Sequence, residues 1–165
     1  MPERGARFGG HPIHPALVSL PIGLWIFSLM ADVVRGLGGG PVWQELALYT
    51  LGAGIVGALI AAVPGFIDYL TITDARVRDI AVAHMVTMLV VLGVFASSFW
   101  LRWIGSPSAL PVALSVLGTA LLGVGAWLGG EMVFTHGQGM RGMAATPRRK
   151  IDSREETGPP RSRVA

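Results

Sequence analysis

The chain has 165 residues, of which 52% are hydrophobic and only 14% are charged, and its formal net charge is +3. Soluble domains carry about 25% charged residues, so this composition places the chain among membrane proteins. Because the sequence has no cysteine, it excludes disulfides, thiolate metal sites, iron–sulfur ligation and cysteine nucleophiles. Basic residues gathered in loops and a tail are what membrane topology requires, so we expect no nucleic-acid binding.

Four long apolar stretches follow a short polar segment, residues 1–14, at the start of the chain. Twenty residues of helix extend ~30 Å, which is the thickness of the hydrocarbon core of a bilayer. The sequence therefore predicts an all-α, up-down bundle of four transmembrane helices in a domain of residues 15–140. The predicted spans lie at about 15–34, 42–63, 80–100 and 109–128. Residues 141–165 are basic and poor in apolar residues, which predicts a disordered C-terminal tail.

Prolines and glycines inside the apolar stretches indicate where the helices bend and pack. Pro21 predicts a kink in the first span, because it leaves the carbonyl of Leu17 without its usual donor. In the second span, Gly52-x-Gly54-x-x-Gly57 has the spacing of a dinucleotide-binding fingerprint, but no strand precedes it. Small residues that let helices approach closely explain this spacing better. Pro64 is expected to end or bend the second helix.

The distribution of basic residues predicts the orientation in the membrane. With four spans, both termini and the loop between spans two and three lie on one side. Eleven of the thirteen Lys and Arg residues are on that side, and only Arg35 and Arg102 are on the other. Because cytoplasmic loops carry an excess of Lys and Arg, we expect a bacterial inner-membrane protein with both termini in the cytoplasm.

The same topology places the four histidines on the cytoplasmic side. His14 precedes span one, and His84 lies about one turn inside span three. Ionisable side chains at membrane depth are costly and usually mark functional sites. Imidazole ligates both haem iron and divalent metals, so we expect His14 and His84 to bind haem b or a metal ion and to serve electron or proton transfer. The residues expected to support this pair are His11, His136, Asp68 and Glu131.

Each of these residues also has a structural explanation that the sequence leaves open. His84 could hydrogen-bond a carbonyl of a neighbouring helix, because polar residues commonly bridge membrane helices. His11 and His14 could sit at a helix start beside prolines, and His136 could lie in an exposed loop. The protein would then be a non-catalytic membrane scaffold or accessory subunit. A transporter or quinone site would require a homo-oligomer, and no hydrolase motif is present, so the sequence favours a protein that is not an enzyme.

Residues 10–23, with the motif His-Pro-Ile-His-Pro and then Pro-Ile-Gly, resemble an uncharacterised family of bacterial membrane proteins, domain of unknown function 2231. The resemblance continues at residues 64–69, 83–84 and 129–139, and it covers roughly residues 9–140. It implies a four-helix membrane protein. Some members are joined to a Rieske iron–sulfur domain, which implies electron transfer. Because this sequence has no cysteine, we expect any redox partner to be a separate protein.

Overall fold

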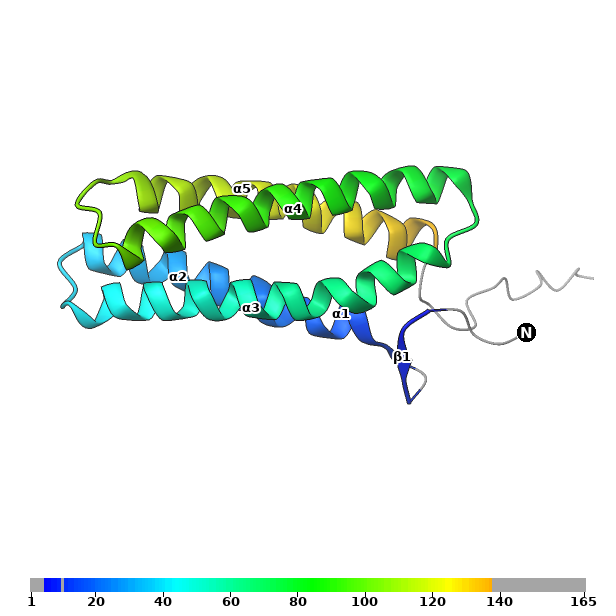
Figure 1. Ribbon diagram of the computed structural model, residues 1–165, viewed down its shortest axis with the longest axis horizontal. Helices are drawn as coiled ribbons and strands as arrows, with labels where there is room; N and C mark the ends of the chain where they lie inside the picture. The colour runs from blue at the N-terminus through cyan, green and yellow to red at the C-terminus, as the bar shows by residue number, and fades with distance from the viewer. Residues whose placement is uncertain (1–4, 10, 138–165) are drawn as a thin grey trace, which may run out of the picture.

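A computed structural model describes residues 5–9 and 11–137 of the chain. Within them, two antiparallel helical hairpins pack on one another as an elongated four-helix bundle (Figure 1). The described residues contain four helical segments that are long and apolar enough to cross a membrane. The predicted all-α membrane bundle is therefore confirmed. The predicted tail at residues 141–165 lies outside the described residues.

The first hairpin begins with a broken helix and ends with a long one. Its elements are α1 (Ile13–Leu17), α2 (Ser19–Gly36) and α3 (Val42–Leu70). The break between α1 and α2 falls at Val18, because Pro21 has no N–H to donate to the carbonyl of Leu17. Pro64 does not end α3, which continues through it for more than a turn. Helix α3 is therefore longer than the apolar stretch that predicts it.

The second hairpin contains α4 (Ala75–Trp103), α5 (Leu110–Gly130) and a final π-helical turn, η1 (Glu131–Thr135). Helix α4 begins at Ala75 because the side chain of Asp74 accepts a hydrogen bond from the N–H of Val77, at 3.0 Å. The helix starts before the predicted third span, so His84 lies about two and a half turns inside it rather than one.

A short β-hairpin precedes the bundle, with strands β1 (Arg7–Phe8) and β2 (His11–Pro12). Hydrogen bonds from backbone N–H groups attach it to the bundle. The N–H of Ala6 donates to the carboxylate of Asp68 at 2.7 Å, and the N–H of Ile13 donates to the carbonyl of Ala6 at 3.0 Å. The β-hairpin and the end of η1 lie at the same end of the bundle (Figure 1).

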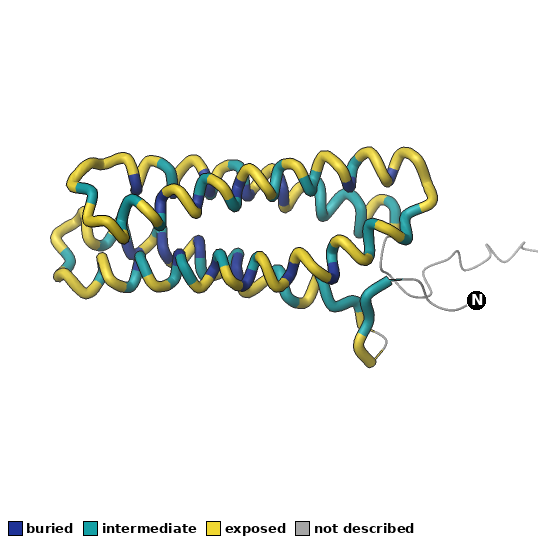
Figure 2. Tube along the Cα trace, viewed as in Figure 1, coloured by how far each residue is buried: buried dark blue, intermediate teal, exposed yellow. Residues whose placement is uncertain are grey.

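Large buried side chains fill the bundle centre between the hairpins. The rings of Trp25 and Phe95 stack there with their centroids 4.3 Å apart. Leu51, Val91 and Leu122 complete this core. Buried residues face inward, while the outer faces of the helices are exposed (Figure 2). Many exposed side chains are large and apolar, as expected for helices whose outer face meets lipid.

Candidate functional site

The imidazoles of His14 and His84 lie next to each other at the end of the bundle that carries the β-hairpin. Their ring centroids are 6.4 Å apart, and the ring planes are nearly perpendicular, at 85°. His14 comes from α1 and His84 from α4, so each hairpin contributes one ring from its first helical segment. Both residues are half-buried. The structure thus brings together the two residues that the sequence predicts as ligands.

Each imidazole is held by one hydrogen bond to a helix carbonyl. Nδ1 of His14 donates to the carbonyl of Ala61 at 2.8 Å, and Nδ1 of His84 donates to the carbonyl of Gly125 at 2.9 Å. A carbonyl oxygen only accepts, so both rings carry their proton on Nδ1 when neutral. Each Nε2 therefore has a free lone pair, and neither Nε2 makes a hydrogen bond within the described residues.

A glycine lies against each ring, one helical turn after the accepting carbonyl. A Cβ added at Gly65 would be 2.7 Å from Nδ1 of His14, so only glycine fits there without moving the ring. At Gly129 an added Cβ would be 3.4 Å from Cε1 of His84. None of these glycines or carbonyls is predicted from the sequence. The sequence signal that could have located them is a pair of small residues four positions apart in each hairpin's second helix, Ala61 with Gly65 and Gly125 with Gly129.

The four residues predicted to support the pair have other contacts. His11 is exposed in β2, and Nδ1 of His136 donates to the carbonyl of Glu131 within its own turn, at 3.2 Å. The carboxylate of Asp68 binds the N–H of Ala6. Among residues 5–9 and 11–137, no group of three or more His, Cys, Asp or Glu side chains is arranged to hold a metal ion. A supporting role for these four residues stays a prediction.

A buried ion pair lies at the opposite end of the bundle. The guanidinium of Arg102 binds both carboxylate oxygens of Asp32, each at 2.7 Å, and the two side chains are only 10% and 5% exposed. Arg102 also donates to the hydroxyls of Ser98 and Ser115, at 3.3 and 3.1 Å. Bidentate pairing with additional hydrogen bonds offsets the cost of burying both charges. Although the sequence places Arg102 on this side, it does not predict the pairing.

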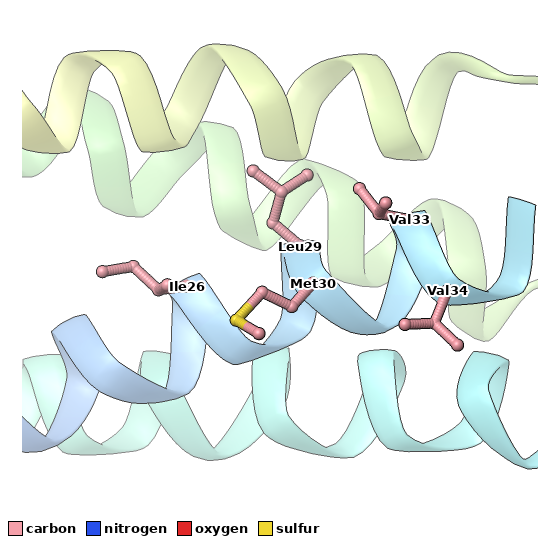
Figure 3. Close-up of a pocket in the computed structure, with 5 residues that line it drawn as sticks. All are labelled: Ile26, Leu29, Met30, Val33 and Val34. Carbon is pink, nitrogen blue, oxygen red and sulfur yellow. The ribbon is translucent and has the colours of Figure 1, made fainter. Parts of the chain in front are cut away.

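Two surface hollows lie away from the imidazoles. One apolar hollow of about 320 Å³ is lined by side chains of α2 alone (Figure 3). Its lining residues are Ile26, Leu29, Met30, Val33 and Val34. Three of these side chains belong to the exposed outer face. With no polar group to bind or react, this hollow has the character of a lipid-facing surface. A smaller hollow, of about 230 Å³, lies beside Arg102.

Comparison with known proteins identifies a family but no characterised relative. The family model for DUF2231, described as a predicted membrane protein, matches residues 10–142. No curated protein and no solved structure matches the chain. The match covers most of the sequence, which confirms the resemblance of the His-Pro motif and leaves the activity to be inferred from the site.

Proposed function

Because this chain belongs to the DUF2231 family of predicted membrane proteins, we propose that it acts within the lipid bilayer as an electron- or proton-transfer protein. In this proposal, Nε2 of His14 and Nε2 of His84 ligate haem b or a divalent metal ion. The observation that carries the proposal is the pairing of two half-buried imidazoles from separate hairpins, each oriented through Nδ1 by a helix carbonyl.

The hydrogen bonds at Nδ1 support a role as ligands. Metal-ligating histidines almost always donate their other ring N–H to a carbonyl or carboxylate, which fixes the tautomer and raises ligand basicity. The ring centroids of His14 and His84 are 6.4 Å apart, which is close enough for one bound group to contact both imidazoles.

Haem b fits two imidazoles better than a bare divalent ion does. Haem b would bring the other ligands of its iron, so the imidazoles of His14 and His84 would be enough to hold it and it would supply one-electron chemistry. A divalent ion held by protein alone takes four or more ligands, and the described residues bring no third His, Cys, Asp or Glu to the pair. We therefore favour haem b as the cofactor, with electron transfer as its function.

The site would lie near the cytoplasmic face of a bacterial inner membrane. Helix α1, which carries His14, and the final turn η1 lie at the same end of the bundle (Figure 1). The excess of Lys and Arg on that side argues for a cytoplasmic orientation. Electrons would then pass between the bilayer and a separate redox protein.

The test is the absorption spectrum and metal content of the protein purified from membranes in mild detergent. The proposal predicts a Soret band, or stoichiometric metal, that is lost in His14→Ala and in His84→Ala. Ser97→Ala is the control, because that exposed hydroxyl bonds to Gly93 within its own helix, and it should keep the full signal. A wild-type protein with neither a Soret band nor stoichiometric metal would rule out the haem and metal versions.

The same hydrogen bonds favour a second candidate, a non-catalytic scaffold in which the histidines tie helices together. His14 joins α1 to α3, and His84 joins α4 to α5, each bond contributing about 0.5–1.5 kcal/mol. The variant His84→Asn separates the two functions, because its side-chain amide can donate to the same carbonyl but is not a haem ligand. If the His84→Asn protein is stable and its spectrum is unchanged, the scaffold function is favoured. Loss of a bound chromophore at unchanged stability favours the ligand function.

A further inference from the structure

We infer that the membrane bundle consists of two copies of one helical hairpin in tandem, and that each copy presents the surface into which the other fits. The copies are residues 14–70 and 84–134. Their first helices correspond at a spacing of 70 residues, the spacing that separates Asp32 from Arg102. Their second helices correspond at a spacing of 64 residues, because α4 ends earlier than α2 and α5 begins later than α3 relative to the corresponding positions. The inference holds whether or not the imidazoles bind a ligand.

Identical residues recur at these spacings. In the first helices they are His14 and His84, Gly23 and Gly93, and Ser28 and Ser98. In the second helices they are Gly54 and Gly118, Ala62 and Ala126, and Gly65 and Gly129. The buried positions recur as well, since Pro21, Trp25 and Ser28 in α2 correspond to Val91, Phe95 and Ser98 in α4.

The corresponding side chains make the same contacts inside each hairpin. His14 donates to Ala61, as His84 donates to Gly125. The hydroxyl of Ser28 donates to the carbonyl of Ala47 at 2.8 Å, as that of Ser98 donates to Pro111 at 2.6 Å. The accepting residues are themselves related by the spacing of the second helices. Shared sequence patterns alone do not require shared partners, so the agreement of donors and acceptors is independent support.

The aromatic residues of the core follow the same rule. The ring of Trp25 lies against Gly54, where an added Cβ would be 2.5 Å from the indole. The ring of Phe95 lies against Gly118, where an added Cβ would be 2.9 Å from the phenyl ring. Each hairpin thus uses a glycine of its second helix to make room for an aromatic side chain of its first.

Corresponding residues also meet each other across the interface between the hairpins. Only residues on a two-fold axis contact their own equivalents. Three pairs of corresponding residues contact each other at successive positions along the bundle. The imidazoles are 6.4 Å apart, the stacked rings of Trp25 and Phe95 are 4.3 Å apart, and Asp32 binds Arg102 at 2.7 Å. The axis therefore runs along the bundle, as expected for repeats that cross the membrane in the same direction (Figure 1).

The charged pair makes the two copies complementary instead of identical. Like charges facing each other on the axis would repel in a buried setting, whereas Asp32 and Arg102 attract. The surrounding residues differ accordingly, because Arg102 donates to Ser115, whose counterpart in the first hairpin is the buried Leu51. Each hairpin therefore pairs with the copy that carries the opposite charge at this position, Asp32 in the first and Arg102 in the second.

Exchanging Asp32 with Arg102 tests whether the two hairpins correspond. The neighbouring residues Leu51 and Ser115 are then exchanged as well. Asp32→Arg alone should lower the Tm in detergent by more than about 10 °C, since it buries two facing cations. The exchanged protein, with Asp32→Arg and Arg102→Asp, should recover most of this loss. Adding Leu51→Ser and Ser115→Leu should bring the Tm to within about 3 °C of the wild type. An exchanged protein no more stable than the single variant would contradict the inference.

An aromatic exchange gives a test that does not depend on charge. Trp25→Phe with Phe95→Trp moves the indole between corresponding positions, where it lies against Gly118 and the corresponding acceptor is the carbonyl of Ser115, which also accepts from Thr119 at 2.8 Å. The control, Trp25→Phe with Phe99→Trp, has the same composition but uses a position that does not correspond. We expect the first protein to keep its Tm within about 3 °C of the wild type and the control to fall below it. If the control is equally or more stable, the two-copy architecture is overturned.

Discussion

Gly65→Ala tests how the imidazole of His14 is held in place. The added Cβ would lie 2.7 Å from Nδ1 and 2.8 Å from Cε1 of that ring. The ring must therefore move, and its hydrogen bond to the carbonyl of Ala61 is lost. The corresponding change, Gly129→Ala, would place Cβ 3.4 Å from Cε1 of His84, which is an ordinary van der Waals contact. The two substitutions are chemically identical and differ only in the space behind them.

The magnitudes follow from these contacts. Loss of the hydrogen bond costs about 0.5–1.5 kcal/mol, and crowding of a packed side chain costs about 1–3 kcal/mol. The better helix propensity of alanine returns up to about 1 kcal/mol. Gly65→Ala should therefore lower the free energy of unfolding by about 1–3 kcal/mol, whereas Gly129→Ala should change it by less than about 1 kcal/mol in either direction.

The assay is unfolding of the purified protein in detergent, followed by far-UV circular dichroism. A loss of 1 kcal/mol shifts the Tm of a domain of this size by about 2–8 °C, so the expected difference between the two variants is measurable. The reasoning is refuted if Gly65→Ala is as stable as the wild type, or if Gly129→Ala is the more damaging of the two.

The same unfolding assay checks two further predictions, each with a control. Gly54→Ala drives a Cβ to 2.5 Å from the ring of Trp25, which is 1% exposed, and should cost about 1–3 kcal/mol. Gly123→Ala meets no atom within 4 Å and should leave stability unchanged or raise it by up to about 1 kcal/mol. Arg102→Ala leaves a buried carboxylate without its partner and should cost about 3–5 kcal/mol. Arg35→Ala removes an exposed bond to a carbonyl and should cost less than about 1 kcal/mol.

The four membrane-length helices could be predicted because length and hydropathy are properties of a whole segment. The helix ends could not, since they depend on local chemistry rather than on hydrophobic thickness. Asp74 starts α4 before the apolar stretch begins, and α3 runs through Pro64 to Leu70. Hydropathy indicates where the bilayer lies along a helix and does not indicate where the helix starts or stops.

The pairing of His14 and His84 could be anticipated from an even number of crossings, which brings both to one end of the bundle. Their partners could not, because the accepting carbonyls depend on how each helix is rotated about its axis. In a soluble bundle, apolar periodicity reveals that rotation. In a membrane bundle the lipid-facing side is also apolar, so Gly65 and Gly129 appear in the sequence as two small residues among many.

The electron paramagnetic resonance spectrum of the ferric protein, after haem is added to the purified chain, tests the paired-imidazole site most directly. Ligation by both His14 and His84 predicts a six-coordinate, low-spin signal with one haem per chain, converted to a high-spin signal or lost in His84→Ala. A high-spin signal in the wild type, or a low-spin signal that survives removal of His84, would contradict ligation by this pair.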